Sequence, residues 1–470
     1  MTAPLRRRTV LLAGGVLAVF GGGTAPAAAG TAPGADPDPA ADAQVAAILR
    51  RIRPPHFPDR WYDVTGFGAV GDGATDCTAA IRTAIETCHR YGGGHVVVPA
   101  GDYRTGAVHL LSGVDLHLAQ GARLAFSQDP AAYLPVVATR YEGTECYNYS
   151  PFVYAYGQRD IAVTGHGVLD GRADATHWWD WTGGPPPNEG PDKTLLIQQA
   201  EAGVPVEERV FGDGHFLRPN LLQFNRCENV LLDGITVKDS PMWNIHPVLC
   251  RNVTIRGVTV DSPNGPNNDG IDPESCTDVL IENCTISTGD DCIAFKSGKD
   301  ADGRRVNVPS RYAVVRHCEM ADGNGGVTAG SETSGGVMDI FVRDCRMSSP
   351  HLERAIRIKS NPDRGGTIAN IDVRRVTVGQ AADSAIEIVL NYANVTTGAY
   401  PPDVHGISIS GLTVASAPRA LNLLGLTTDP LRDIRLHQCR FDAITDENVI
   451  ADVDGLRLDQ VWINGERVDN

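Results

Sequence analysis

The sequence lacks several features that would assign it to common classes of protein. It has no basic excess, because 41 Lys and Arg stand against 57 Asp and Glu and the formal net charge is −16, whereas proteins that bind nucleic acid or anionic membranes are normally basic. It has no Cys-x-x-Cys pair with zinc spacing. Its 51 Gly and 30 Pro follow no fixed period, which excludes collagen and indicates many turns. We therefore expect neither a nucleic-acid partner nor a membrane partner.

The first thirty residues have the pattern of a secretory signal. Basic residues 6–8 precede a short apolar run over residues 10–20, and alanines 27–29 are small enough for cleavage. Crossing a bilayer takes about 20 apolar residues; the run over residues 10–20 is too short, and no second segment offers them. We predict a signal peptide over 1–29, a flexible leader over 30–52, and a single domain over 53–470 of a secreted monomer. The arginines favour the twin-arginine route without excluding general export.

The eleven cysteines are an odd number, so at least one thiol is expected to be free. Most of them occupy one position of a repeated pattern, which favours a role as small buried hydrophobic residues. One or two disulfides stay open as an alternative, because secreted proteins permit them.

A short repeat indicates the fold. Each unit has alternating apolar residues followed by polar or Gly residues and then an apolar residue or Cys. The units begin at Val230, Val253, Val279, Ala313, Ile340, Ile371, Ile407 and Ile434. Each unit predicts a strand with one buried face, which only stacked neighbours can cover. The period predicts an all-β fold, a right-handed parallel β-helix, because the leucine-rich consensus is absent and propeller blades are longer. We expect the longer gaps between units to form loops on one rim.

Two further segments interrupt the repeat. Residues 76–90 have apolar side chains at helical spacing, with Thr75 or Asp76 as the N-cap, and predict a helix that covers the amino-terminal end of the solenoid. Residues 183–220 form a long insertion with a short predicted helix over 194–201. Long ordered insertions are often functional, although a tolerated surface insertion is the alternative.

Carboxylates gather in two neighbouring repeats. Asp269 and Asp272 belong to one unit, and Asp290 and Asp291 belong to the next, about one coil later. A β-helix stacks such residues on one face, where repulsion between ionised acids raises the pKa of one of them. A proton donor beside a carboxylate that activates water is what glycoside hydrolysis requires. The alternative is that both segments are ordinary turns.

Cations are predicted on the same face. Arg357 and Lys359 alternate along a strand and point the same way, and Lys296 follows the Asp pair. Such a row either binds a carboxylated ligand or balances the acids. The Asp groups could instead bind Ca²⁺, but the nearby cations argue against it.

The motifs resemble those of glycoside hydrolase family 28, the polygalacturonase-like pectin hydrolases, and especially of its bacterial members. The resemblance covers about residues 60–400. Its four motifs correspond to Asn267-Asn268-Asp269, Gly289-Asp290-Asp291, Gly323-Asn324-Gly325 and Arg357-Ile358-Lys359. Residues 67–73 also resemble an amino-terminal segment that this family shares with other β-helix enzymes.

The resemblance implies a role for each motif. Asp290 is expected to be the general acid, and Asp269 and Asp291 to hold and deprotonate the attacking water. The reaction would be inverting, with acid and base carboxyls about 6.5–9.5 Å apart. Arg357 and Lys359 are expected to bind the uronate carboxylate next to the cut. No metal or other cofactor is implied.

One motif departs from the family pattern, because Asn324 stands where the family has His. Asn donates a hydrogen bond but carries neither proton nor charge. We expect activity to persist with a lower rate or a shifted pH optimum. A degenerate site that only binds sugar is the alternative.

Other predicted substrate contacts come from the same resemblance. Asn267 belongs to the first motif, Trp243 is expected to stack on a sugar ring, and His246 to hydrogen-bond it. Arg218 is a candidate for a terminal uronate and Tyr392 for a neighbouring subsite. For Trp243 and His246 buried packing is the alternative, for Arg218 a surface arginine without a ligand, and for Tyr392 a structural role.

The prediction is a hydrolase of α-1,4-linked galacturonan that acts on chain ends, because the insertion could wall one end of the cleft. A hydrolase of rhamnogalacturonan or decorated pectin, and an endo-acting enzyme, are the alternatives. A lyase is disfavoured because it would usually need Ca²⁺. A carbohydrate-binding solenoid with a weakened site is the non-enzyme alternative.

Overall fold

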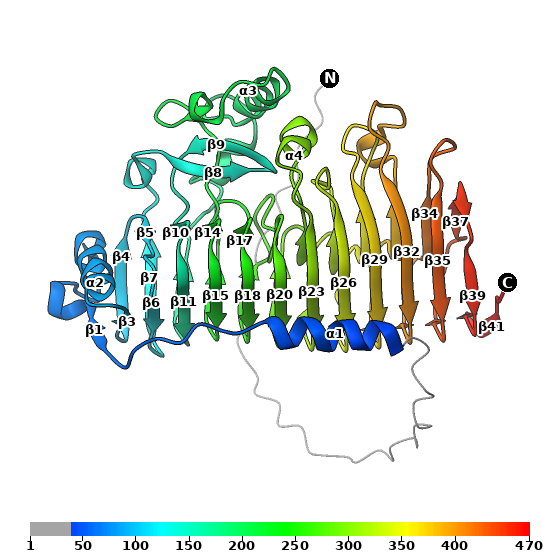
Figure 1. Ribbon diagram of the computed structural model, residues 1–470, viewed down its shortest axis with the longest axis horizontal. Coiled ribbons are helices and arrows are strands. Elements are labelled where there is room, and N and C mark those ends of the chain that lie inside the picture. Colours follow the sequence, from blue (N-terminus) through cyan, green and yellow to red (C-terminus); the bar gives the residue numbers. More distant parts are fainter. Residues whose placement is uncertain (1–38) are drawn as a thin grey trace, which may run out of the picture. The chain divides into compact units, whose positions relative to one another are not determined.

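The computed structural model describes residues 39–470, of which Ala41–Asn470 form one compact unit. The predicted signal peptide and residues 30–38 of the predicted leader lie outside the described residues. Three parallel sheets run the length of a β-helix, from the first coils in blue to the last in red (Figure 1). We call these three sheets the trunk.

The first trunk sheet contains the repeat. Its strands are β1 (Trp61–Asp63), β3 (Gly94–Val98), β6 (Val114–Leu118), β11 (Arg159–Gly165), β15 (Glu228–Asp233), β18 (Arg251–Arg256), β20 (Thr277–Glu282), β23 (Ser310–Arg316), β26 (Val337–Arg343), β29 (Thr367–Arg374), β32 (Asp403–Ser410), β35 (Leu431–His437), β38 (Val453–Asp454) and β39 (Arg457–Asp459). Val230 lies opposite Val253, Val253 opposite Val279, and so on to Ile434, so the repeat and the predicted β-helix are confirmed.

The second trunk sheet follows the first along each coil. Its strands are β2 (Asp72–Asp76), β4 (Gly101–Thr105), β7 (Ala122–Phe126), β12 (Val168–Asp170), β16 (Thr236–Lys238), β19 (Thr259–Ser262), β21 (Thr285–Thr288), β24 (Glu319–Met320), β27 (Arg346–Met347), β30 (Thr377–Val378), β33 (Thr413–Val414), β36 (Arg440–Phe441), β40 (Trp462–Ile463) and β41 (Glu466–Arg467). Only the last pair, β40 and β41, is antiparallel among the described pairs of this sheet.

The third trunk sheet has two parts that single bridges join. The parts are β5 (Val108–His109), β10 (Val153–Tyr156), β14 (Leu222–Asn225) and β17 (Ile245–Val248), then β22 (Ile293–Phe295), β25 (Val327–Ala329), β28 (Arg354–Lys359), β31 (Ser384–Val389), β34 (Arg419–Leu424) and β37 (Val449–Ala451). Ile271 bridges to Ile245 on one side and to Ile293 on the other. The acidic segments lie at this join.

Apolar side chains of the three sheets fill one continuous core inside the trunk. Each fully buried Val, Leu or Ile contributes about 1.5–3 kcal/mol relative to an exposed one. All eleven cysteines are buried free thiols, and no disulfide joins them within residues 39–470. Their role as small buried hydrophobic residues is therefore confirmed.

The predicted capping helix is α2 (Thr78–Arg90), which covers the first coil (Figure 1). Ile81, Ala84, Ile85 and Cys88 are buried as the spacing predicts. The helix starts two residues later than expected, yet the Asp76 carboxylate accepts the Thr78 N–H at 2.9 Å and satisfies one free donor of the first turn.

The structure differs from the predicted flexible leader over its last residues. Residues 39–51 form helix α1 (Pro39–Arg51), which lies across the outer face of the first sheet (Figure 1). Ala41, Ile48 and Ile52 are buried against apolar side chains that point outward from the trunk, namely Leu280, Val314 and Phe341. Ala41 and Ile48 lie seven residues apart on one helix face, a spacing that composition alone does not show.

Apart from α1 and α2, several segments outside the trunk gather along one edge, at the top of Figure 1. They are an antiparallel hairpin of β8 (Val137–Tyr141) and β9 (Thr144–Asn148), a strand β13 (Val210–Phe211), and the helices α3 (Gly190–Glu201) and α4 (Asp300–Val306). We call these segments, with the loop 361–365, the rim. Helix α3 confirms the short helix predicted in the insertion, and α4 occupies one of the long gaps.

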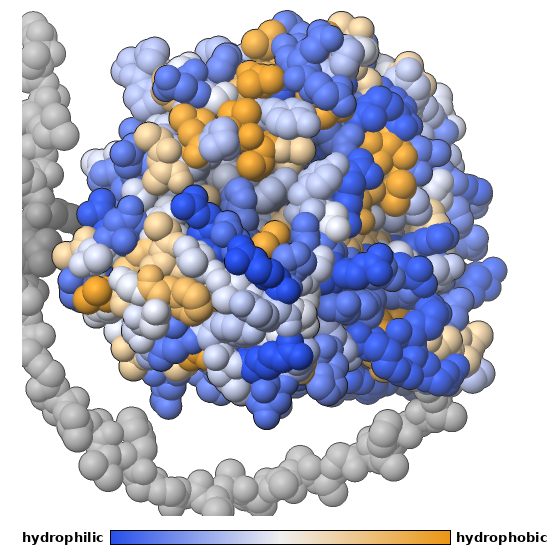
Figure 2. All heavy atoms as spheres, turned by 60° about the vertical axis from the view of Figure 1, so that its left-hand side comes forward, coloured by the Kyte–Doolittle hydropathy of each residue, from blue (hydrophilic) through white to orange (hydrophobic). Residues whose placement is uncertain are grey.

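Five short 3₁₀ helices lie within residues 39–470. They are η1 (Val64–Phe67), η2 (Pro130–Tyr133), η3 (Trp179–Thr182), η4 (Val206–Glu208) and η5 (Tyr392–Asn394). None of the helices within residues 39–470 is long and apolar enough to cross a membrane. The face seen in Figure 2 is mostly hydrophilic, with hydrophobic residues in small separate groups.

Candidate active site

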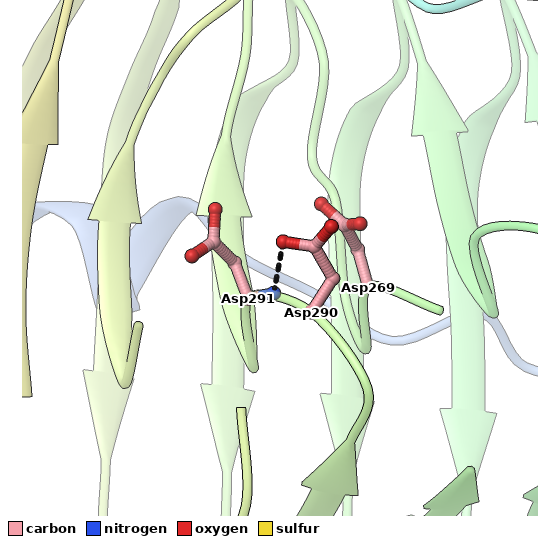
Figure 3. Close-up of side chains that lie close together, drawn as sticks. All are labelled: Asp269, Asp290 and Asp291. Atoms are coloured by element: carbon pink, nitrogen blue, oxygen red, sulfur yellow. Dashed lines mark hydrogen bonds between the residues drawn. The ribbon is translucent and has the colours of Figure 1, made fainter. Parts of the chain in front are cut away.

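The two acidic segments lie on adjacent coils, as the sequence predicts. The Gly270 N–H donates to the Asp291 carbonyl at 2.9 Å, and the Ile271 N–H donates to the Cys292 carbonyl at 3.0 Å. Asp269 and Asp291 therefore occupy equivalent positions one coil apart. The side chains of Asp269, Asp290 and Asp291 extend to the same side of the sheet (Figure 3).

The three carboxylates lie close together. One oxygen of each lies within 4.8 Å of one oxygen of each of the others. The predicted separation of about 6.5–9.5 Å refers to whole carboxyl groups and stays a prediction. The fold explains the closeness of Asp269 and Asp291, because adjacent strands are about 4.8 Å apart and set the spacing of residues that they carry at equivalent positions.

Two cations keep Asp291 ionised. Its carboxylate accepts the Lys359 ammonium at 2.7 Å and the Arg357 guanidinium at 3.3 Å. Burial alone would raise the pKa of Asp291, but Lys359 and Arg357 hold it below its ordinary value.

Asp290 differs from Asp291 in exposure and in partners. It is half-buried, and its Oδ1 accepts the Asp291 N–H at 2.9 Å and the Asn324 side-chain N–H at 3.0 Å. Burial and the negative charge of Asp291 raise the pKa of Asp290. Adjacent acids with pKa values displaced in opposite directions can act as a proton donor and a base.

Lys296 lies between three acids. Its ammonium is 3.0 Å from an oxygen of Asp269, 3.2 Å from one of Glu332 and 3.8 Å from one of Asp272. It also lies 4.1 Å from the centroid of the Trp243 ring, a favourable cation–π distance.

Asp272 and Asp269 share this single cation. Burial raises the pKa of both carboxyls, that of Asp269 to about 8. Neither oxygen of the fully buried Asp272 has a hydrogen-bond partner within the described residues. Leaving an ionised carboxylate unpaired in this way is costly, so the first proton of the pair belongs on Asp272 while Asp269 keeps its ion pair with Lys296.

A small polar pocket of about 180 Å³ opens at these residues. Its lining comprises Glu142, Trp243, Asn267, Asp269, Asp290, Lys296, Lys299, Ser331, Glu332, Lys359, Arg364 and Tyr392. The trunk and the rim both contribute. Asn267 and Tyr392, two predicted substrate contacts, face this pocket, and Asn324 lies beside it through its bond to Asp290.

The structure contradicts the predicted sugar contact of His246. This residue is fully buried, its Nε2 lies 2.8 Å from Glu274, and its Nδ1 accepts from Asn220 at 2.8 Å. The hairpin of β8 and β9 covers this part of the third sheet, where the Thr139 hydroxyl donates to Gln223. His246 is therefore a structural residue.

Arg218 also differs from its prediction, and Trp243 is mostly buried. Arg218 is fully buried and donates to Glu189 at 2.8 and 3.0 Å and to Asn267 at 2.8 Å. It positions Asn267 and has no surface for a uronate. Trp243 lines the pocket but is only 3% exposed, and its ring lies against the Lys296 ammonium; its stacking on a sugar stays a prediction.

The sequence did not predict several pocket residues that lie in the rim or in the segments next to it. Glu142, Lys299, Ser331 and Glu332 belong to no repeated motif, so the sequence offers no signal that places them near the acids. Asp272 carried a signal, because it lies three residues after Asp269 in the same acidic segment.

The oxygens of Asp269, Asp290 and Asp291 are close enough to hold a metal ion. Lys296, Lys359 and Arg357 already supply positive charge to the same oxygens. The donor set therefore fits an ion-paired acid cluster better than a hard-cation site, which normally has six or more oxygen ligands.

A parallel β-helix that carries a carboxyl of raised pKa beside one of lowered pKa has the arrangement expected of a solenoid glycoside hydrolase. The family profile of "Glycosyl hydrolases family 28" matches residues 213–439. The chain belongs to this family. The profile "Rhamnogalacturonase A/epimerase, pectate lyase-like" matches residues 61–117.

Individual relatives agree with this assignment. The chain is 31% identical to a probable polygalacturonase of Vitis vinifera, over 78% of this chain and 71% of the relative. It is 26% identical to an exo-poly-alpha-D-galacturonosidase of Dickeya chrysanthemi, over 79% of this chain and 65% of the relative. Among solved structures, an exopolygalacturonase from Thermotoga maritima superimposes with a TM-score of 0.85 and 42% identity, covering 91% of this chain and 97% of that one.

Proposed function

We propose that this hydrolase is secreted and cleaves α-1,4-linked galacturonan from a chain end by a single displacement with inversion. The observation that carries the proposal is the pair of adjacent carboxyls, Asp290 with a raised pKa and Asp291 with a lowered one, beside Arg357 and Lys359. The relatives named as polygalacturonases support the substrate.

In this proposal Asp290 protonates the glycosidic oxygen, because it is the acid that is both half-exposed and able to keep its proton. Asp291 and Asp269 hold the attacking water and accept its proton. Both oxygens of Asp291 are bound by cations, which weakens that carboxylate as a nucleophile toward carbon. Arg357 and Lys359 attract the uronate carboxylate at the same place.

Action on chain ends is supported by the small size of the pocket and by the hairpin beside it. A hollow of about 180 Å³ is smaller than typical ligand sites of about 300–1,000 Å³ and suits one sugar residue. The hairpin of β8 and β9 contacts Lys299 on one side of the pocket. There the Lys299 backbone N–H donates to the Gly143 carbonyl at 3.1 Å.

Incubation with polygalacturonate and with saturated oligogalacturonates, followed by chromatography, tests the substrate and the mode. Release of monomer from the start supports exo action, mixed oligomers would indicate endo cleavage, and no product would remove the proposal. Amino-terminal sequencing of exported protein tests cleavage after residue 29.

Proton NMR of the first product tests the stereochemistry separately. Retention, which proceeds through a covalent intermediate, is the alternative outcome. Initial formation of the β-anomer from the α-linkage supports inversion, and initial formation of the α-anomer would establish retention.

A further inference from the structure

The chain between α1 and β1 crosses the outer face of the first trunk sheet and leaves a groove beside it. This segment is the dark blue stretch that runs to the first strands of the trunk in Figure 1. Phe57 anchors the segment, because its ring is buried against Ala162 of β11 and Leu231 of β15. The groove between the segment and the sheet has a volume of about 440 Å³, which is within the usual range of ligand sites.

The groove is separate from the acidic pocket. It lies on the first five strands of the first sheet, from β1 to β15, whereas the pocket opens at the join in the third sheet. The two hollows have no lining residue in common. A ligand in the groove therefore does not compete with a substrate for the acid cluster.

Trp61 is an exposed residue of the groove whose ring has a fixed orientation. It is 58% exposed, yet its ring stacks on the His95 imidazole with the two centroids 4.3 Å apart, and its Nε1 donates to Asp59 at 2.6 Å. His95 is held in turn, because its Nδ1 lies 2.7 Å from the Asp115 carboxylate. Binding normally costs the freedom of an exposed side chain, and fixing the ring beforehand removes that cost. The uncovered part of the indole is therefore a preorganised apolar platform.

Polar groups beside this ring have unused hydrogen-bonding capacity. His117 bonds through Nδ1 to the Thr164 hydroxyl at 2.9 Å. Among the described residues, the Nε2 atoms of His95 and His117 and both ring nitrogens of the exposed His166 have no hydrogen-bond partner. An apolar ring bordered by free donors and acceptors suits a sugar, which presents C–H groups on its face and hydroxyls at its edge.

The charges of the lining favour an uncharged ligand. The lining contains neither Lys nor Arg. Its two carboxylates are already engaged. Asp115 accepts from the Thr164 hydroxyl and lies against His95, and Asp233 pairs with Arg256 at 2.7 Å. A uronate in the groove would lie beside two acids without a free Lys or Arg in the lining to balance its charge.

We propose that this groove is a second carbohydrate site, which binds uncharged sugar residues of a polysaccharide on the exposed ring of Trp61. The site goes beyond the proposed hydrolysis and does not depend on it. It holds the protein on a polysaccharide while the acidic pocket, on another sheet, stays free for its own substrate.

Affinity electrophoresis tests the site, in gels that contain a neutral β-1,4-galactan, an arabinan, a xyloglucan or polygalacturonate. The parent protein is the full chain with Asp290→Asn, so that polygalacturonate is not hydrolysed. We expect at least one neutral polymer to retard the parent protein, and Trp61→Ala in the same background to weaken that binding by about tenfold. Trp462→Ala is the matched control, because Trp462 is 42% exposed on β40, at the other end of the trunk, and does not line the groove.

Each outcome decides for or against the site. If no neutral polymer retards the parent protein, or if Trp61→Ala is retarded equally, the proposal is overturned. Retardation that depends on Trp61 but occurs only with polygalacturonate would overturn the assignment to uncharged sugars. If Trp61→Ala fails to fold, Trp61→Phe takes its place. The bound neutral polymer must then change the tryptophan fluorescence of the parent protein, and Trp61→Phe must lose this change.

Discussion

In the trunk each structural position recurs once per coil, whereas in the rim each contact is made once, between segments far apart in the sequence. Val230, Val253 and Val279 align because the same strand is repeated. Glu142 and Lys299 meet because a hairpin and a helix start happen to reach the same place, 157 residues apart. The trunk therefore supplies the reacting acids, and the rim determines which part of a substrate can reach them.

The strongest test of the trunk side of this comparison is Asp290→Asn. The amide keeps the shape of the carboxyl but cannot donate the proton, so we expect kcat to fall by about 10²–10⁴-fold with an unchanged Tm. Steady-state kinetics on oligogalacturonates measures the loss. Asp261→Asn on β19 is the control, because Asp261 is exposed and outside the pocket. Wild-type turnover by Asp290→Asn would remove the assignment of the acid.

Gly143→Ala tests the rim side. Gly143 has φ = +81° at the hairpin turn, and an added Cβ would meet the Lys299 backbone at 2.7 Å. We expect the hairpin tip to move off Lys299 and kcat/KM to fall by about tenfold, the loss of one charge-assisted contact.

Gly157→Ala separates this displacement from backbone strain. Gly157 also has a positive φ, +64°, but nothing lies within 4 Å of its added Cβ. Strain alone costs about 1–2 kcal/mol at either position. If kcat/KM falls by the same factor in both variants, the contact between Gly143 and Lys299 does not cause the loss.

The regular part of the molecule was the predictable part. The repeat placed Asp269 one coil from Asp291, and the strand period placed Arg357 and Lys359 on the same face, because both features follow from backbone geometry. The same reasoning failed for His246, since it lies in the row of the third sheet that the hairpin covers. Whether an outward residue faces solvent depends on the rim.

Arg218 and helix α1 show the same limit in other ways. Arg218 forms a buried ion pair with Glu189. Both residues lie in the same insertion, but no short-range sequence pattern predicts that they meet. Helix α1 covers Leu280, Val314 and Phe341, three outward apolar residues of the trunk. Outward apolar residues in an otherwise alternating repeat are the physical signal that something packs on that face.

Asp272→Asn tests the cost of burying acids in the trunk. A carboxyl whose pKa is higher in the folded than in the unfolded state binds more protons when the protein is folded. Such a group destabilises the folded state increasingly as the pH rises. The loss begins at about pH 4, where the unfolded group ionises, and continues up to the folded pKa. Burial raises the pKa of Asp272 in this direction. We expect the variant to have a Tm several degrees higher at pH 8 and an unchanged Tm at pH 3.5, by calorimetry.

Asp170→Asn provides the opposite case. Asp170 is equally buried but is 2.7 Å from the Arg123 guanidinium, so its loss should lower the Tm. A lower Tm for Asp272→Asn at pH 8 would mean that Asp272 is ionised and paired in solution, which would contradict the proton placement between Asp269 and Asp272.

Asn324→His produces the smallest expected effect. Asn324 donates to Asp290 and lowers its pKa slightly against burial, and an imidazolium at this place would favour the ionised carboxyl further. The acid must be protonated to act. We therefore expect the basic limb of the pH–kcat/KM profile to move to lower pH by less than about one unit. We also expect kcat to change. Asn324→Gln keeps an amide and has no titratable group, so its basic limb should stay in place. Identical profiles for the His and Gln variants would show that residue 324 acts through its shape and that its charge does not control the proton of Asp290.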